Sequence, residues 1–179
     1  MSIVTKTGDQ GETSLLFGKR TRKDSLRVYA CGEVDELNAA IGLLKAHLRD
    51  LPNSDKEISE LEGIQRQLIN LMGELATAPE DKNNYISSGF EAIKESDVAG
   101  LEEFIKITEA KNIKFEGWAL PGGNKAASFS DLCRTVCRRA EREVVKVGYD
   151  DQDLNPIIKV YLNRLSDYFW LKARDLENV

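Results

Sequence analysis

Three arginines in the segment CRTVCRRAERE, residues 133–143, are spaced so that a helix would bring their side chains together. At about 100° per residue, Arg134, Arg138 and Arg142 share one flank with Glu141, while the apolar residues face away. Crowded guanidinium groups repel one another unless anions neutralise them, and their planar forks suit phosphate oxygens. The segment therefore indicates either a phosphate-binding flank or a solvated face on which Glu141 pairs with an arginine.

The N-terminal segment TKTGDQGETS, residues 5–14, is rich in backbone donors, hydroxyls and small residues, as phosphate-cradling loops are. It is not a P-loop, because that motif needs GxxxxGK followed by Ser or Thr. Here Gly11 and Gly18 are too far apart, and Arg20 follows Lys19. Taken alone, such a segment is more often a flexible tail than a nucleotide site.

Other polar residues lie off the apolar stripes of their segments. Asp35 and Asn38 in EVDELN are available to an outside partner, although an ordinary polar flank looks the same. Asn163 in YLNRLSD is unfavourable in the middle of a helix, which indicates a hydrogen-bonding duty. Trp118 suits either a core position or a ligand platform.

Apolar residues recurring every three or four positions predict the helices that position these side chains. Ser96 and Asn155 are capping candidates, Pro156 suits a first helical position, and Gly148 is expected to end the fourth helix. The stretch 80–88 is polar and is expected to connect helices. The predicted helices cover about 27–48, 58–75, 96–107, 126–147 and 156–169.

These helices predict an all-α fold, a five-helix up-and-down bundle preceded by an irregular nucleotide-binding segment. A chain of 179 residues is expected to form a single domain. Within it, residues 1–26 form the N-terminal loop and residues 27–179 the bundle.

Composition excludes several functional classes. A net charge of -5 and a pI near 5.1 argue against broad nucleic-acid binding. No apolar run reaches the roughly 18 residues that span a bilayer, and the N-terminus lacks a signal-peptide core, so we expect a cytoplasmic protein without a membrane segment. Cys31, Cys133 and Cys137 are interpreted as reduced packing thiols rather than metal ligands.

Five segments occur in this order along the chain: TKTGDQGETS, RVYACGEVDELNAAIG, LPGG, CRRAERE and YLNRLSDYFW. Together they resemble the signature blocks of the ATP:cob(I)alamin adenosyltransferases of the propanediol-utilisation type, and the resemblance spans nearly the whole chain. It implies a homotrimer that holds ATP between subunits.

The resemblance also implies roles for particular residues. Asp35 would pair with Arg134 across the subunit boundary. Trp118, where the family usually has Phe, would help to keep the lower axial ligand off cobalt. The positions that match the family's ATP-binding residues are Thr5, Lys6, Thr7, Gly8, Thr13, Lys23, Arg138, Arg139, Glu141, Arg142 and Asn163.

The implied reaction transfers the 5′-deoxyadenosyl group of ATP to the cobalt of cob(I)alamin and releases triphosphate. Mg²⁺ is the expected companion of the polyphosphate. A cob(II)alamin reductase and an adenosylcobalamin-dependent enzyme are implied as partners. Two other hypotheses stay open from the sequence: a nucleotide-sensing or cobalamin-delivery module without turnover, and a purely structural bundle.

Overall fold

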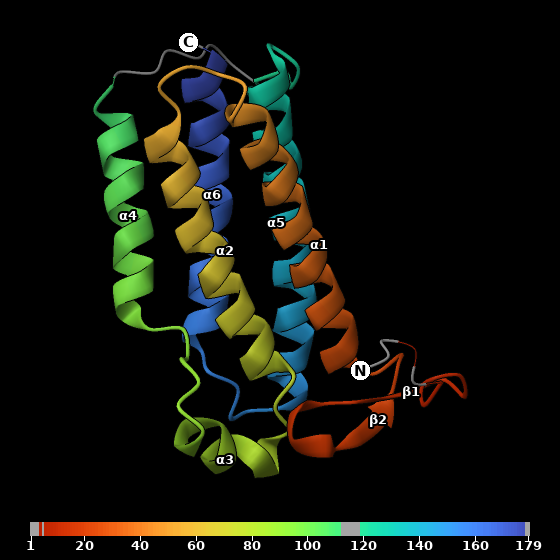
Figure 1. The fold of residues 1–179 in the computed structure, drawn as a ribbon. Helices are drawn as coiled ribbons and strands as arrows, with labels where there is room; N and C mark the ends of the chain where they lie inside the picture. The colour runs from red at the N-terminus through yellow and green to blue at the C-terminus, as the bar shows by residue number, and fades with distance from the viewer. Residues whose placement is uncertain (1–3, 5, 112–118, 178–179) are drawn as a thin grey trace.

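The computed structural model describes residues 4, 6–111 and 119–177, which form a bundle whose long helices run along its long axis (Figure 1). The short helix α3 and the N-terminal segment lie at one end of the bundle, and the C-terminus lies at the other. The helices are α1 (Leu26–Leu48), α2 (Asp55–Leu75), α3 (Lys82–Ser87), α4 (Glu95–Glu109), α5 (Lys125–Asp150) and α6 (Ile157–Glu177).

The prediction of a helical bundle is confirmed, with two differences. Helix α3 follows a 3₁₀ turn at Pro79–Asp81 in the stretch expected to be a connection. It buries only Tyr85, so it has no apolar stripe to reveal it. The N-terminal segment contains a two-stranded antiparallel sheet of β1 (Glu12–Ser14) and β2 (Arg20–Arg22). Three-residue strands are too short for a recognisable alternation.

Two helix ends differ from the prediction. Gly148 does not end α5, which continues to Asp150 because its hydrogen bonding continues past the glycine. Lys94, rather than Ser96, precedes α4, and its N–H donates to the Asp97 carboxylate at 2.8 Å. The expected cap of α6 is present, since the N–H of Ile157 donates to Asn155 Oδ1 at 3.1 Å.

The core lies where the predicted stripes of α1, α2, α5 and α6 meet. Leu37, Leu68, Cys137 and Phe169 are fully buried, one from each of these helices. Burying one large apolar side chain stabilises a fold by about 1.5–3 kcal/mol, so these stripes hold the bundle together. In the part of the chain that the structure describes, no helix is both long and apolar enough to cross a membrane.

Candidate functional site

The outer flank of α5 carries the arginines whose spacing suggested an anion site. Arg138 is exposed, and among the described residues its guanidinium has no hydrogen-bond or ion-pair partner. Arg142, one turn further along the helix, is also exposed and donates from Nη1 to the backbone carbonyl of Arg138 at 3.0 Å, which leaves its charge without an ion-pair partner. Two positive charges therefore stand side by side on this flank, facing solvent.

Glu141 forms no ion pair with an arginine among the described residues, which differs from the pairing expected on a solvated face. Its Oε1 accepts a hydrogen bond from Asn163 Nδ2 at 3.3 Å, which ties α6 to α5. The hydrogen-bonding duty expected of Asn163 is thus present within the chain. Arg138 and Arg142 are exposed and form no ion pair with a described residue, so an external anion can reach both.

Arg139 points elsewhere, although it is adjacent to Arg138 in the sequence. Its Nε donates to Glu33 and its Nη2 to Glu36, both on α1. These two carboxylates raise the pKa of Arg139 through hydrogen bonding and charge. We did not identify Glu33 and Glu36 from the sequence, and only their spacing of three residues on α1 signalled a shared helix face.

Arg134 and Asp35 do not meet within this chain. Arg134 Nε donates to Asp131 Oδ1 of its own helix at 3.4 Å. Asp131 also accepts from Arg174 Nη2 at 2.6 Å, and the side chains of this second pair are 4% and 3% exposed. Asp35 is exposed on α1 and forms no hydrogen bond or ion pair with a described residue. Asn38, one turn later, has a buried Oδ1 that also lacks a partner in the described part of the chain.

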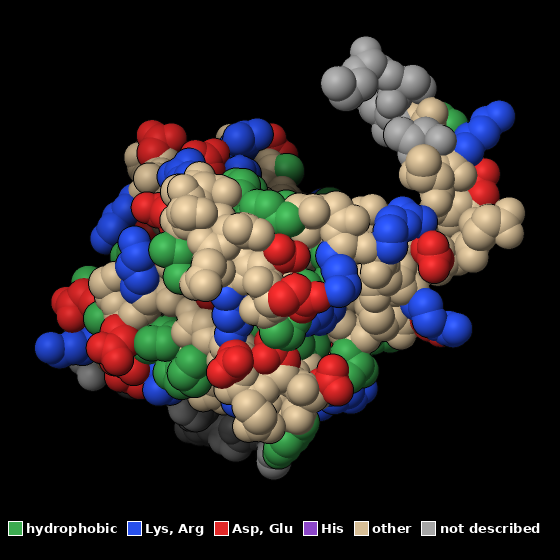
Figure 2. Space-filling view, turned by 90° about the horizontal axis from the view of Figure 1, so that it is seen from below, with side chains coloured by type: hydrophobic (Ala, Val, Ile, Leu, Met, Phe, Trp, Pro, Cys, Tyr) green, Lys and Arg blue, Asp and Glu red, His purple; other side chains and the backbone are tan. Residues whose placement is uncertain are grey.

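The N-terminal segment is fastened to the end of α2. The N–H of Leu16 donates to the carbonyl of Ala76 at 2.8 Å, and Lys19 pairs with Glu80. Seen from this end, the segment projects from the body of the bundle (Figure 2). These contacts place the segment beside the C-terminal end of α2.

Inside the segment, Gly8 and Lys23 are packed together. A Cβ built on Gly8 would lie 3.1 Å from Lys23 Nζ, so the ammonium lies close against the loop backbone at this glycine. The N–H of Lys23 donates to the carbonyl of Gly11, whose φ of 83° also favours glycine. The loop thus holds a lysine ammonium against one of its glycines.

Other predicted residues of the segment are spread along the hairpin. Arg20 donates from Nη2 to the carbonyl of Thr7 at 3.0 Å and closes the loop, a role the sequence did not reveal. Thr13 pairs with Thr21 between β1 and β2, and Lys6 is exposed. Two predicted site residues, Thr5 and Trp118, lie outside the described residues.

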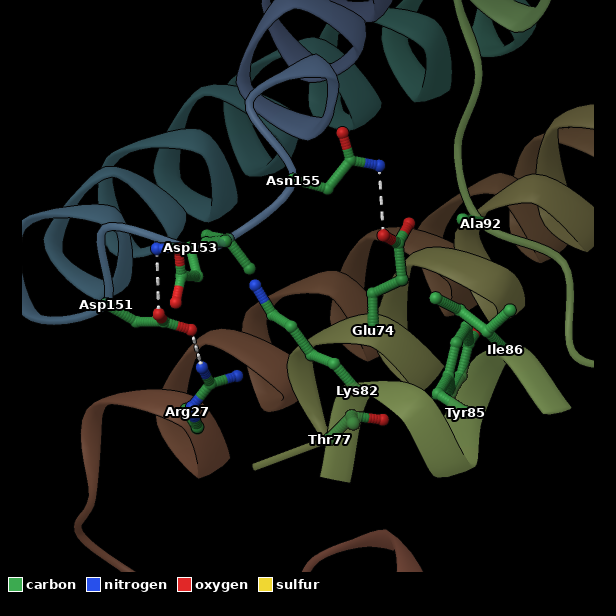
Figure 3. A pocket seen from close by; sticks show the side chains of 11 residues that line it. Arg27, Glu74, Thr77, Lys82, Tyr85, Ile86, Ala92, Asp151, Asp153 and Asn155 are labelled. Carbon is green, nitrogen blue, oxygen red and sulfur yellow. Dashed lines mark hydrogen bonds and ion pairs between the residues drawn. The ribbon is translucent and has the colours of Figure 1, made fainter. Parts of the chain in front are cut away.

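A separate pocket of about 260 Å³ lies near α3, and none of the predicted site residues lines it (Figure 3). Arg27 is bonded there to Asp151 and to the carbonyl of Leu75. Glu74 accepts from the N–H of Ile93 at 2.7 Å and from Asn155 Nδ2 at 2.9 Å. Burial raises the pKa of Glu74, and these hydrogen bonds partly offset the shift. The pocket's polar groups mainly fasten the end of the bundle.

The sequence matches the family model described as cobalamin adenosyltransferase over residues 3–176. A corrinoid adenosyltransferase of Bacillus subtilis is 41% identical over 97% of this chain and 86% of its own length. The corrinoid adenosyltransferase PduO of Salmonella typhimurium is 37% identical over 97% of this chain and 49% of its own length. Among solved structures, a variant PduO-type ATP:corrinoid adenosyltransferase from Lactobacillus reuteri, complexed with cobalamin and ATP, superposes with a TM-score of 0.86. It is 36% identical and is matched over 99% of this chain and 94% of that one.

Proposed function

This chain belongs to the cobalamin adenosyltransferase family and is an ATP:corrinoid adenosyltransferase, and we propose that the arginine flank of α5 binds the triphosphate of ATP. The observation that carries this proposal is the exposed Arg138 guanidinium, which has no partner among the described residues and stands beside Arg142. A triphosphate supplies the missing negative charge, and its oxygens match the guanidinium forks.

In the reaction, the reduced cobalt of cob(I)alamin attacks the ribose 5′ carbon of ATP, and the bond from that carbon to the triphosphate oxygen breaks. The electron pair of that bond leaves with triphosphate, so the step needs no general acid or base from the protein. Arg138 and Arg142 stabilise the charge on the leaving group, and the site holds the two substrates in line. Positioning and electrostatics are therefore the protein's contribution.

We propose that the loop of residues 1–26 completes the ATP site around the polyphosphate, with the helical remainder, residues 27–179, as its scaffold. Gly8 and Lys23 support this assignment, because they place an ammonium against a glycine of the loop. Mg²⁺ would be held mainly by phosphate oxygens and water, since the described residues contain no group of three carboxylate, His or Cys side chains suited to a metal. The other proposed ATP contacts are Thr5, Lys6, Thr7, Thr13, Glu141 and Asn163.

A homotrimer with ATP between subunits is part of this proposal. Asp35 and Arg134 do not pair within the chain, which leaves Asp35 free to meet Arg134 of a neighbouring copy. A further argument comes from helix register. Helices α1 and α5 run antiparallel (Figure 1), and Arg139 on α5 meets Glu36 on α1. Leu132 lies seven residues before Arg139, and Leu43 lies seven residues after Glu36, so the two leucines lie at one level of the same face. Both leucines are about half exposed, at 44% and 54%, as expected of a face that another subunit covers.

We further propose that Trp118 keeps the lower axial ligand off cobalt, and that a cob(II)alamin reductase and an adenosylcobalamin-dependent enzyme act before and after this protein. A cytoplasmic location accords with ATP as substrate. It also accords with Cys31, Cys133 and Cys137, which are free thiols.

Arg138→Ala tests the phosphate-binding flank. Losing a charge-assisted phosphate contact costs about 1.5–3 kcal/mol, so the KM for ATP should rise about ten- to a hundredfold. The measurement is adenosylcobalamin formation from cob(I)alamin, followed by visible absorbance over a range of ATP concentrations. Arg66→Ala is a matched control, because Arg66 is also exposed but lies on α2, and it should leave the KM unchanged. Equal KM values for Arg138→Ala and the unmodified protein would contradict the assignment.

A further inference from the structure

The guanidinium of Arg139 is held by two carboxylates of a neighbouring helix. Its Nε donates to Glu33 and its Nη2 to Glu36, positions one turn apart on α1. The Glu33 side chain is 12% exposed, so this half of the contact is largely shielded from water. We call these three residues the α1–α5 clamp.

The clamp makes Arg139 a poor phosphate ligand, although its neighbour Arg138 is a good one. Successive helical residues point about 100° apart, so Arg138 faces the open flank when Arg139 faces α1. Arg139 with Glu33 and Glu36 carries a net charge of about −1 at neutral pH, which repels phosphate. A triphosphate that used Arg139 would first have to displace both carboxylates.

What the clamp does hold is the relative placement of two helices that carry site residues. A single guanidinium bonded to two acids one turn apart restricts both the rotation of α1 and its sliding along α5. Asp35 lies on α1 between the two glutamates, and Arg138 lies next to Arg139. On the other side of α5, the hydrogen bond from Asn163 to Glu141 holds α6.

We infer that Arg139 is a positioning residue for adenosyl transfer: it acts through Glu33 and Glu36 to fix Asp35 and α1 beside the phosphate-binding flank, and it does not itself contact phosphate. This inference rests on the proposed role of that flank. It replaces the family-based expectation that Arg139 binds ATP.

Two variants separate a positioning role from a phosphate contact. Glu33→Gln removes the negative charge from the shielded half of the clamp and leaves only a neutral acceptor there, without altering α5. A displaced helix should lower kcat at saturating ATP by about tenfold with little change in the KM for ATP, since errors of about 1 Å in a site can cost a hundredfold. Arg139→Gln should show the same pattern. If Arg139 bound phosphate, Arg139→Gln would raise the KM, and Glu33→Gln would lower it by releasing the arginine.

A charge swap provides the rescue test. In the single variant Arg139→Glu, the new carboxylate is repelled by Glu33 and Glu36 on α1. In the double variant Glu33→Arg with Arg139→Glu, opposite charges again attract α1 to α5, but α5 lacks the Arg139 guanidinium. The swap should recover kcat to within about threefold of the unmodified protein, because the placement of α1 returns. A swap no more active than Arg139→Glu would overturn the inference, as would a KM effect of Arg139→Gln equal to that of Arg138→Ala.

Melting temperatures identify any variant that fails to fold. Arg164→Gln is the matched control, because Arg164 also holds two carboxylates, Glu102 and Asp167, but joins α6 to α4. It should change the melting temperature without changing kcat. The outcome for Arg138→Ala is read independently, so an unchanged KM there would contradict the phosphate-binding flank and not the clamp.

Discussion

A buried ion pair between Asp131 on α5 and Arg174 on α6 offers the most quantitative test of how the bundle is held. The two side chains are 4% and 3% exposed, and their atoms are 2.6 Å apart. Replacing Asp131 with Leu would leave the Arg174 guanidinium buried without its main partner. Breaking such a pair costs about 3–5 kcal/mol, because one uncompensated charge remains out of water.

The expected loss lies near the lower end of that range. Arg174 Nε also contacts Glu177 Oε2 at 2.8 Å, and the Glu177 side chain is 26% exposed, so part of the compensation survives. We therefore expect Asp131→Leu to lower the free energy of unfolding by about 3 kcal/mol. Adding Arg174→Met removes the partly compensated charge, so the double variant should lose about 1 kcal/mol or less.

Urea unfolding measures these differences, with all variants at one protein concentration because assembly shifts apparent stability. Glu102→Gln is the control: it removes an ion pair of Arg164 whose side chains are 32% and 52% exposed and should cost less than about 1 kcal/mol. A loss below about 1 kcal/mol for Asp131→Leu, or a double variant less stable than the single one, would refute the reasoning.

Three other predictions concern buried or site residues. Tyr161→Phe should lower the free energy of unfolding by about 1 kcal/mol, because the buried Tyr161 hydroxyl donates to a glutamine of α2 at 2.7 Å. Tyr168→Phe should be neutral or stabilising, because the buried Tyr168 hydroxyl has no partner among the described residues. Equal losses of stability for the two variants in urea unfolding would contradict this prediction. Burial raises the pKa of Cys31 to about 11 and of Cys133 to about 12, so at pH 8 only roughly one Cys31 thiol in a thousand is ionised. A disulfide-exchange reagent should therefore label both only as the protein unfolds, and rapid labelling of native protein would count against it. Trp118→Ala should lose more rate with cob(II)alamin and a reductant than with cob(I)alamin, and equal losses would remove Trp118 from the reduction step.

The elements that could be predicted from the sequence are the helices that bury an apolar face in the core. Val34, Leu37 and Ile41 are fully buried at helical spacing, and burial is what imposes that spacing. Helix α3 and the β1–β2 hairpin lack this requirement, because they lie at the end of the bundle and bury few side chains. No apolar period exists there to be recognised.

The helix that carries the arginines was predictable from the sequence, but the partners of those arginines were not. Helical spacing placed Arg138 and Arg142 on one flank, as the structure has them. The ion-pair partners of Arg139 lie on α1, the helix that packs against α5. These partners, Glu33 and Glu36, are more than a hundred residues away in the sequence. Local spacing carries no information about such a partner.

The division of roles along α5 follows from which helix each residue faces. Arg139 faces α1 and is bonded there, Glu141 is bonded to Asn163 on α6, and Arg134 is taken by Asp131 of its own helix. Arg138 faces neither neighbour and has no partner among the described residues. Its charge is exposed at the surface of the bundle, where an anion from outside the chain can reach it. The triphosphate of ATP, which we propose as that anion, would complete the flank by supplying oxygens that match the guanidinium forks.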